Sequence, residues 1–135
     1  MKTPREIVDL MMKEDAFSKL LGMKVLSIEK GECQLSLKVE EDFVNGFNIA
    51  HGGLSYALAD SSLAFAANSY GRKAVSIETS ISHTRPSFKG DTITVTCSEE
   101  NKSKRLGIYI AKVLNQEGKL VALFKGTVHF SEELW

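Results

Sequence analysis

A chain of 135 residues has the size of one domain, and its 43% hydrophobic and 25% charged residues are ordinary for a globular protein. This composition excludes a disordered or fibrous chain. Lysine plus arginine and aspartate plus glutamate both total 17, so no strong field attracts nucleic acid or an acidic membrane surface. We expect one domain over residues 1–135 and no nucleic-acid partner.

The first residues predict a short amphipathic helix. The stretch 3–6, Thr-Pro-Arg-Glu, has the pattern of a capping box with proline at the first helical position. Ile7, Leu10 and Met11 follow at the spacing of one helical face, which we expect to pack on the core. Residues 1–14 carry scattered charges and lack the pattern of a signal peptide, so a cytoplasmic location is expected.

Alternating apolar residues predict strands on both sides of a long helix. Residues 23–39 have the pattern of a hairpin around Lys30-Gly31, and residues 54–70 that of a helix, with Gly71 as its stop signal. Four further strands are expected around residues 75–81, 93–97, 108–110 and 120–130. The short connections favour antiparallel neighbours. We therefore predict an α+β fold in which a single antiparallel sheet wraps one long helix.

The cysteines and histidines do not indicate a metal site. Cys33 and Cys97 lie far apart and outside any C-x-x-C pair, and we interpret both as small buried hydrophobic residues. His83 and His129 lie in predicted strands, where packed or surface residues are expected rather than ligands. We predict no metal ion.

Asp60 is the one charged residue between Phe43 and Gly71, a stretch of weak polarity. A charge in the centre of such a stretch disfavours membrane insertion, so the helix is expected to be buried in protein. A carboxylate buried there is costly unless something specific interacts with it. One interpretation is that Asp60 caps a backbone group or pairs with a distant arginine. The other, which we prefer, is a general base or nucleophile whose pKa is shifted by partial burial.

The glycines before the long helix can supply the complementary half of a site. Gly52 and Gly53 stand where the helix begins, so their N–H groups have no partner within the helix and carry its positive dipole end. Such N–H groups can stabilise an oxyanion, and the missing Cβ lets a substrate approach closely. The alternative is that the two glycines only form a turn, because a turn without a catalytic role would have the same sequence.

The spacing of the two features favours a dimer. Gly52 and Asp60 are eight residues apart, or about 12 Å along a helix at a rise of ~1.5 Å per residue. A base and an oxyanion donor must both lie within about 3 Å of the reacting atoms. If both groups are catalytic, a two-fold dimer in which the helix start of one subunit faces Asp60 of the other is the simplest solution.

Several motifs together resemble the hot-dog thioesterases of the phenylacetic-acid-degradation type. The resemblance covers nearly the whole chain and rests on Asn45-Gly46, His51-Gly52-Gly53, Leu58-Ala59-Asp60, Asn68-Ser69, Gly71 and the segment 85–91. It implies the hot-dog fold and hydrolysis of an acyl-CoA thioester to free acid and coenzyme A. No cofactor is implied, because coenzyme A is part of the substrate. The resemblance also implies a homodimer as the catalytic unit, assembled further into a homotetramer.

The resemblance assigns roles to individual residues. Asp60 matches the catalytic carboxylate, Gly52 the backbone oxyanion donor, and Asn45 a side chain that helps to bind the thioester carbonyl or water. His51 matches the histidine of the turn, with a role in orientation. Gly53 and Ser76 are expected to contact substrate, Ser76 near a position where some relatives place a hydroxyl that orients water.

Two other functions remain open at this point. A hot-dog hydratase or dehydratase would pair His51 with an acidic residue, and a non-catalytic acyl-CoA-binding module would keep the fold without turnover. The acyl group, aryl-acetyl or medium to long chain, depends on a pocket formed by apolar residues, for which the candidates are Phe43, Phe47, Leu54, Tyr56 and Phe65. Candidates for contacts to the phosphates of coenzyme A are Arg72, Lys73, Arg85, Lys89, Lys102, Lys104 and Arg105.

Overall fold

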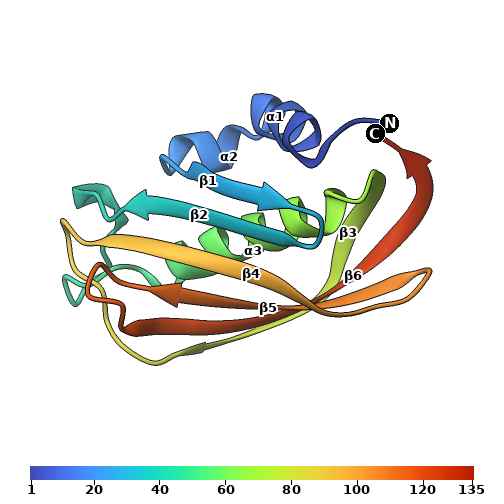
Figure 1. The fold of residues 1–135 in the computed structure, drawn as a ribbon. Helices are drawn as coiled ribbons and strands as arrows, with labels where there is room; N and C mark the ends of the chain where they lie inside the picture. Colours follow the sequence, from blue (N-terminus) through green and yellow to red (C-terminus); the bar gives the residue numbers. More distant parts are fainter.

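The computed structural model describes residues 1–135, and its curved sheet wraps one long helix (Figure 1). Every neighbouring pair of strands in the order β1-β2-β4-β5-β6-β3 is antiparallel. The strands are β1 (Lys24–Glu29), β2 (Glu32–Lys38), β3 (Arg72–His83), β4 (Thr92–Lys102), β5 (Leu106–Leu114) and β6 (Leu120–Leu134). The helices are α1 (Pro4–Glu14), α2 (Ala16–Leu20), the 3-10 turn η1 (Glu41–Phe43) and α3 (Gly52–Asn68). The predicted architecture is confirmed, and so is the predicted order along the chain of a short helix, two strands, a long helix and four strands.

Helix α1 begins at the predicted capping box. The Thr3 hydroxyl accepts the Glu6 N–H at 3.2 Å, and the Glu6 carboxylate accepts the Thr3 N–H at 3.3 Å. The predicted buried face is partly wrong, because Ile7 and Val8 are buried whereas Leu10 is 42% exposed. Since α1 packs against both β1 and α3, two neighbours rather than one decide which face is buried.

The short helix α2 was not predicted. Its N-cap is Asp15, whose carboxylate accepts the Ser18 N–H at 2.9 Å and the Ser18 hydroxyl at 2.7 Å. A helix of five residues is too short to show a periodic apolar face. Its formation depends on this cap and on its contact with α3.

Helix α3 is the centre of the core. It is buried on most of its circumference, and its residues pack on the inner faces of the strands. Cys33 of β2 and Cys97 of β4 are free thiols that lie opposite each other on the neighbouring strands, and both are buried beneath α3. Burial raises the pKa of the Cys97 thiol to about 12, so the expectation of small buried hydrophobic residues is confirmed. None of the helices combines the length and the apolarity needed to cross a bilayer.

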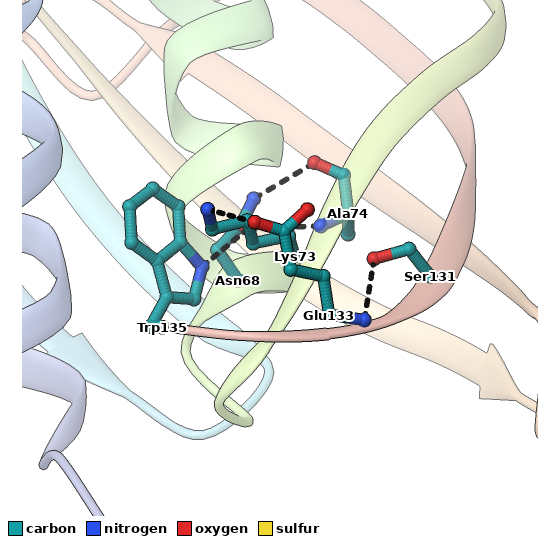
Figure 2. A network of polar contacts seen from close by, with 6 residues as sticks. All are labelled: Asn68, Lys73, Ala74, Ser131, Glu133 and Trp135. Atoms are coloured by element: carbon teal, nitrogen blue, oxygen red, sulfur yellow. Dashed lines mark hydrogen bonds and ion pairs between the residues drawn. The ribbon is translucent and has the colours of Figure 1, made fainter.

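The C-terminal end of α3 is fixed by the side chain of Asn68 (Figure 2). Its Oδ1 accepts the Ala74 N–H at 2.9 Å and the Trp135 indole N–H at 2.8 Å. Its Nδ2 donates to the carbonyls of Ala64 and Ala74 at 2.8 and 3.0 Å. One buried carboxamide therefore joins α3, the start of β3 and the last residue of the chain.

Strand β3 is an edge of the sheet and pairs within the chain only with β6. The pairing contains a bulge between Ser76 and Glu78, so the residues before and after Ile77 alternate in opposite phase. Val75 and Ile77 are 66% and 58% exposed. A long edge strand with exposed apolar side chains offers unpaired backbone groups to a further strand.

Candidate active site

The start of α3 is held by His51. The His51 side chain is the N-cap of the helix, with Nδ1 accepting the Gly53 N–H at 2.8 Å. The Gly53 N–H is therefore engaged, whereas the Gly52 N–H makes no hydrogen bond within the chain. Of the two glycine amides, the one at Gly52 is available to an external oxygen.

Asn45 lies in the loop that leads to the helix. Its Oδ1 accepts the backbone N–H groups of Phe47 and Ile49 at 2.9 and 3.4 Å. Because a carboxamide accepts only through oxygen, these bonds define which way the group points. The Nδ2 donor is left for another partner.

A pocket of about 430 Å³ opens beside the first turn of α3. Asn45 and Gly52 line it, together with His83, Arg85 and Ser87 from the end of β3 and the loop that follows. The imidazole of His83 packs on Gly52: a Cβ added to this glycine would lie 3.3 Å from two of the ring atoms. A larger residue at position 52 would therefore displace His83 and narrow the pocket.

His51 and Gly53 line a separate and smaller hollow of about 230 Å³. The other four residues that line this hollow are all apolar, and two of them, Phe43 and Leu54, were predicted to contact an acyl group. The structure therefore divides the His-Gly-Gly motif between two hollows.

The other apolar candidates lie elsewhere. Phe65 is only 1% exposed and belongs to the core, so its assignment to a pocket is wrong. Phe47 is 87% exposed on the loop before α3. The hydroxyl of Tyr56 is hydrogen-bonded to the Thr79 hydroxyl at 2.6 Å, which ties the helix to β3.

Asp60 is half-buried and has no partner within the chain. No hydrogen bond or ion pair reaches its carboxylate, so neither a backbone cap nor a distant arginine explains it. Burial raises the pKa of the Asp60 carboxyl above its ordinary value, with desolvation as the cause. A desolvated carboxylate without a partner is suited to accept a proton or to attack an electrophile.

Asp60 lies on the side of α3 that faces the edge strand. Asp60 lies one turn after Tyr56 on nearly the same side of the helix, and both Tyr56 and, further along, Asn68 hydrogen-bond to β3. Their partners are Thr79 and Ala74, so Asp60 lies beside the part of β3 between them. Ser76, which was expected to contact substrate, is exposed in that part of the strand.

Asp60 and Gly52 do not meet in one chain. The pocket beside Gly52 does not include Asp60 or Ser76, and eight residues of continuous helix, about 12 Å, separate the two positions. This agrees with the separation expected from the sequence.

Most of the candidate cations have partners in the chain. Arg72 donates to the Lys104 carbonyl and lies over the Phe130 ring, and Lys102 lies over the Tyr70 ring. Lys73 and Lys89 form ion pairs with glutamates. Arg85 is the candidate that lines the pocket beside Gly52.

Sequence reasoning assigned none of four polar residues of this pocket to the site: Ser55, His83, Thr84 and Ser87. His83 is exposed and packs on Gly52, in agreement with its interpretation as a packed or surface residue, but its place beside this pocket was not predicted. It faces the same side of the sheet as its partner Ala122, toward α3. Side chains two residues apart on a strand face the same side of the sheet, so the apolar residue Ile81 could have indicated that His83 faces α3. No comparable pattern in the sequence indicates that Ser55 or Ser87 lines this pocket.

Comparison with known proteins adds an independent result. Residues 47–122 match the thioesterase superfamily. The acyl-coenzyme A thioesterase PaaI of Escherichia coli K12 is 38% identical over 119 residues, which cover 88% of this chain and 85% of that protein. The human acyl-coenzyme A thioesterase 13 is 30% identical over 129 residues, which cover 93% of this chain and 92% of that protein.

Solved structures agree with this assignment. The structure of the E. coli PaaI protein from the phenylacetic acid degradation operon superimposes with a TM-score of 0.95 at 34% identity, covering 97% of this chain and 95% of that chain. The TT0310 protein of Thermus thermophilus superimposes with a TM-score of 0.83 at 40% identity, covering 86% and 97%. The predicted hot-dog fold is thus confirmed. The chain belongs to the thioesterase superfamily, a family of hydrolases.

Proposed function

We propose that this protein is an acyl-CoA thioesterase that cleaves an aryl-acetyl or a medium- to long-chain acyl thioester to free acid and coenzyme A. Relatives at 30–38% identity carry the name acyl-coenzyme A thioesterase. The observation that carries the proposal is the carboxylate of Asp60, half-buried on an apolar helix, without a partner, and with a raised pKa. Water is the second reactant, and no cofactor takes part.

The edge strand supports a homodimer as the catalytic unit. Along β3, His83 lies beside Gly52, and Ala74 lies beside the opposite end of α3. Antiparallel pairing of β3 with the same strand of a second copy, about a two-fold axis between Ile77 and His83, therefore brings the partner's Gly52 toward Asp60. The same pairing would cover the exposed side chains of Val75 and Ile77. Two such dimers would form the proposed homotetramer.

The reaction needs three roles from the chain. Asp60 either takes a proton from a water molecule that attacks the carbonyl carbon, or attacks that carbon itself to form an anhydride that water then cleaves. The Gly52 N–H of the partner subunit stabilises the oxyanion, and the carbon–sulfur bond breaks as coenzyme A leaves as its thiolate. Asn45 donates from Nδ2 to the thioester carbonyl or to water.

The remaining candidate residues have supporting roles. His51, as the cap of α3, holds the Gly52 amide in place, and Gly53 leaves room for the substrate. Ser76, on the part of β3 beside Asp60, would orient the attacking water. A hydratase would require an acidic partner for His51, and no ion pair with a carboxylate involves this residue.

Thiol release from a panel of acyl-CoAs by the wild type and by Asp60→Asn tests the proposal. We expect the wild type to release coenzyme A and the variant, still folded and oligomeric, to be slower by at least ~100-fold. Asp9→Asn, which removes an exposed carboxylate from α1, is the matched control and should retain the wild-type rate. Equal rates for Asp60→Asn and the wild type would remove Asp60 from the mechanism, and a wild type that binds acyl-CoA without releasing thiol would favour a binding module.

A further inference from the structure

Two serine hydroxyls beside the first turn of α3 have no partner within the chain. Ser62 and Ser69, further along the helix, each donate to the carbonyl three residues earlier at 2.6 Å. Ser55 and Ser87 are also buried, at 4% and 3% exposure, yet neither hydroxyl makes a hydrogen bond. Of the two hydroxyl oxygens, that of Ser87 is itself buried without a partner. A buried hydroxyl without a partner is costly, and such groups in native proteins call for an explanation.

Both serines line the pocket of about 430 Å³ beside Gly52. Ser55 follows Gly52 by three residues, about 4.5 Å along the helix axis. Ser87 lies in the loop between β3 and β4, and its carbonyl accepts the Ala50 N–H at 2.8 Å. Two segments distant in sequence therefore bring serines whose hydroxyls have no partner to one pocket, with Ser55 about one helical turn from the Gly52 amide.

The rest of the pocket wall is rich in hydrogen-bond donors. Gly52 contributes its N–H, Asn45 its Nδ2 and Arg85 its guanidinium, and no carboxylate lines the pocket. This chemistry suits an oxygen acceptor on a ligand and disfavours a cation. In the proposed reaction the Gly52 amide takes the thioester oxygen, so the two hydroxyls remain for a second oxygen nearby.

We propose that Ser55 and Ser87 form a second hydrogen-bonding subsite, which holds an oxygen atom of the acyl-CoA other than the thioester oxygen. The identity of the ligand rests on the proposed function. Two parts of an acyl-CoA carry such an oxygen within a few bonds of the thioester: the nearer amide of the pantetheine arm and a substituent on the acyl chain. The subsite would fix the position of the thioester over the Gly52 amide, so both serines are positioning residues.

The test compares Ser55→Ala and Ser87→Ala with the wild type, and Ser62→Ala is the matched buried control. Three quantities are measured: the Kd of coenzyme A by calorimetry, the KM values for butyryl-CoA and for its β-hydroxy derivative, and the Tm of the protein without ligand. We expect the loss of either hydroxyl of the subsite to weaken binding by about 3- to 10-fold, the range of one neutral hydrogen bond. Ser62→Ala should change none of the binding constants.

The source of the oxygen follows from which constants change. If it is the pantetheine amide, the Kd of coenzyme A and both KM values rise together. If it is an acyl substituent, only the KM for the β-hydroxy substrate rises. The Tm separates binding from folding: Ser87→Ala should equal or exceed the wild type, because the hydroxyl has no partner to lose, whereas Ser62→Ala should fall below it.

The proposal is overturned if both variants keep all the binding constants of the wild type, or if they lose Tm as Ser62→Ala does with no change in binding. The same measurements distinguish failure of the subsite from failure of the proposed thioesterase function. A wild type that releases no thiol, but whose affinity for coenzyme A falls in Ser87→Ala, retains the subsite and loses the thioesterase. A wild type that neither binds coenzyme A nor cleaves the substrates overturns both.

Discussion

At the scale of single residues, the charge of Asp60 lowers the stability of the folded chain, because burial partly removes the carboxylate from water. Because burial raises its pKa, the folded chain retains a proton that the unfolded chain releases above its pKa of about 3.9. Stability is therefore lost as pH rises from about 4 through the raised pKa, and the full cost remains at neutral pH. We predict that Asp60→Asn has a higher Tm than the wild type at pH 7, and that the difference disappears below about pH 3.5.

Thermal unfolding of both proteins from pH 3 to pH 8, at one protein concentration, measures this difference. Asp9→Asn on the exposed surface of α1 controls for the loss of one negative charge. A Tm difference for Asp60→Asn that is constant with pH, or that favours the wild type at pH 7, would contradict a desolvated carboxylate.

At the scale of elements, the carboxamide of Asn68 joins the end of α3 to β3 and to the C-terminus (Figure 2). Asn68→Ala leaves the buried Ala74 N–H and the Trp135 indole N–H without their acceptor. We predict that the free energy of unfolding falls by about 2–4 kcal/mol, since each buried group without a partner costs about 1–3 kcal/mol. Denaturation by urea at a fixed protein concentration measures the change.

Ser131→Ala is the matched control for this network. The Ser131 hydroxyl accepts the Glu133 N–H at 3.2 Å in a solvent-exposed position, so its loss should cost less than about 0.5 kcal/mol. Similar losses for the two variants would mean that the Asn68 carboxamide is not what holds the end of α3.

At the scale of the whole molecule, the proposed active site needs two copies of the chain. Ile77, at the bulge of β3, is 58% exposed and lies near the middle of the edge that we propose for pairing. We predict that Ile77→Glu, which places a charge without a partner in the paired edges of the two copies, yields a folded monomer with at least ~100-fold less thioesterase activity. Light scattering and thiol release measure the two effects together.

Leu26→Glu places the same charge on an exposed apolar residue of β1, the opposite edge of the sheet. This control should retain the dimer and its activity. An Ile77→Glu monomer with full activity would show that Gly52 of a partner is not required.

Local patterns in the sequence were sufficient for α1, α3 and the six strands, and for their order along the chain. The capping box at Thr3, the alternation along β2 and β4, and the stop at Gly71 depend on neighbours within a few residues, so they can be recognised without the fold. The charge of Asp60 on an apolar helix could be recognised for the same reason. The helix α2 was missed because five residues are too few for a period.

The sequence by itself determined an antiparallel sheet around one helix, the isolated carboxylate on that helix, and its distance from the Gly52 amide. Tertiary structure alone decided which side chains surround that amide. The pairing of β3 with β6, including the bulge at Ile77, turns His83 toward Gly52 and leaves Val75 and Ile77 exposed at the edge. Strand pairing brings Ser87 to the same pocket as Ser55, 32 positions away in the chain. Contacts of this kind join residues distant in sequence, so no local periodicity contains them.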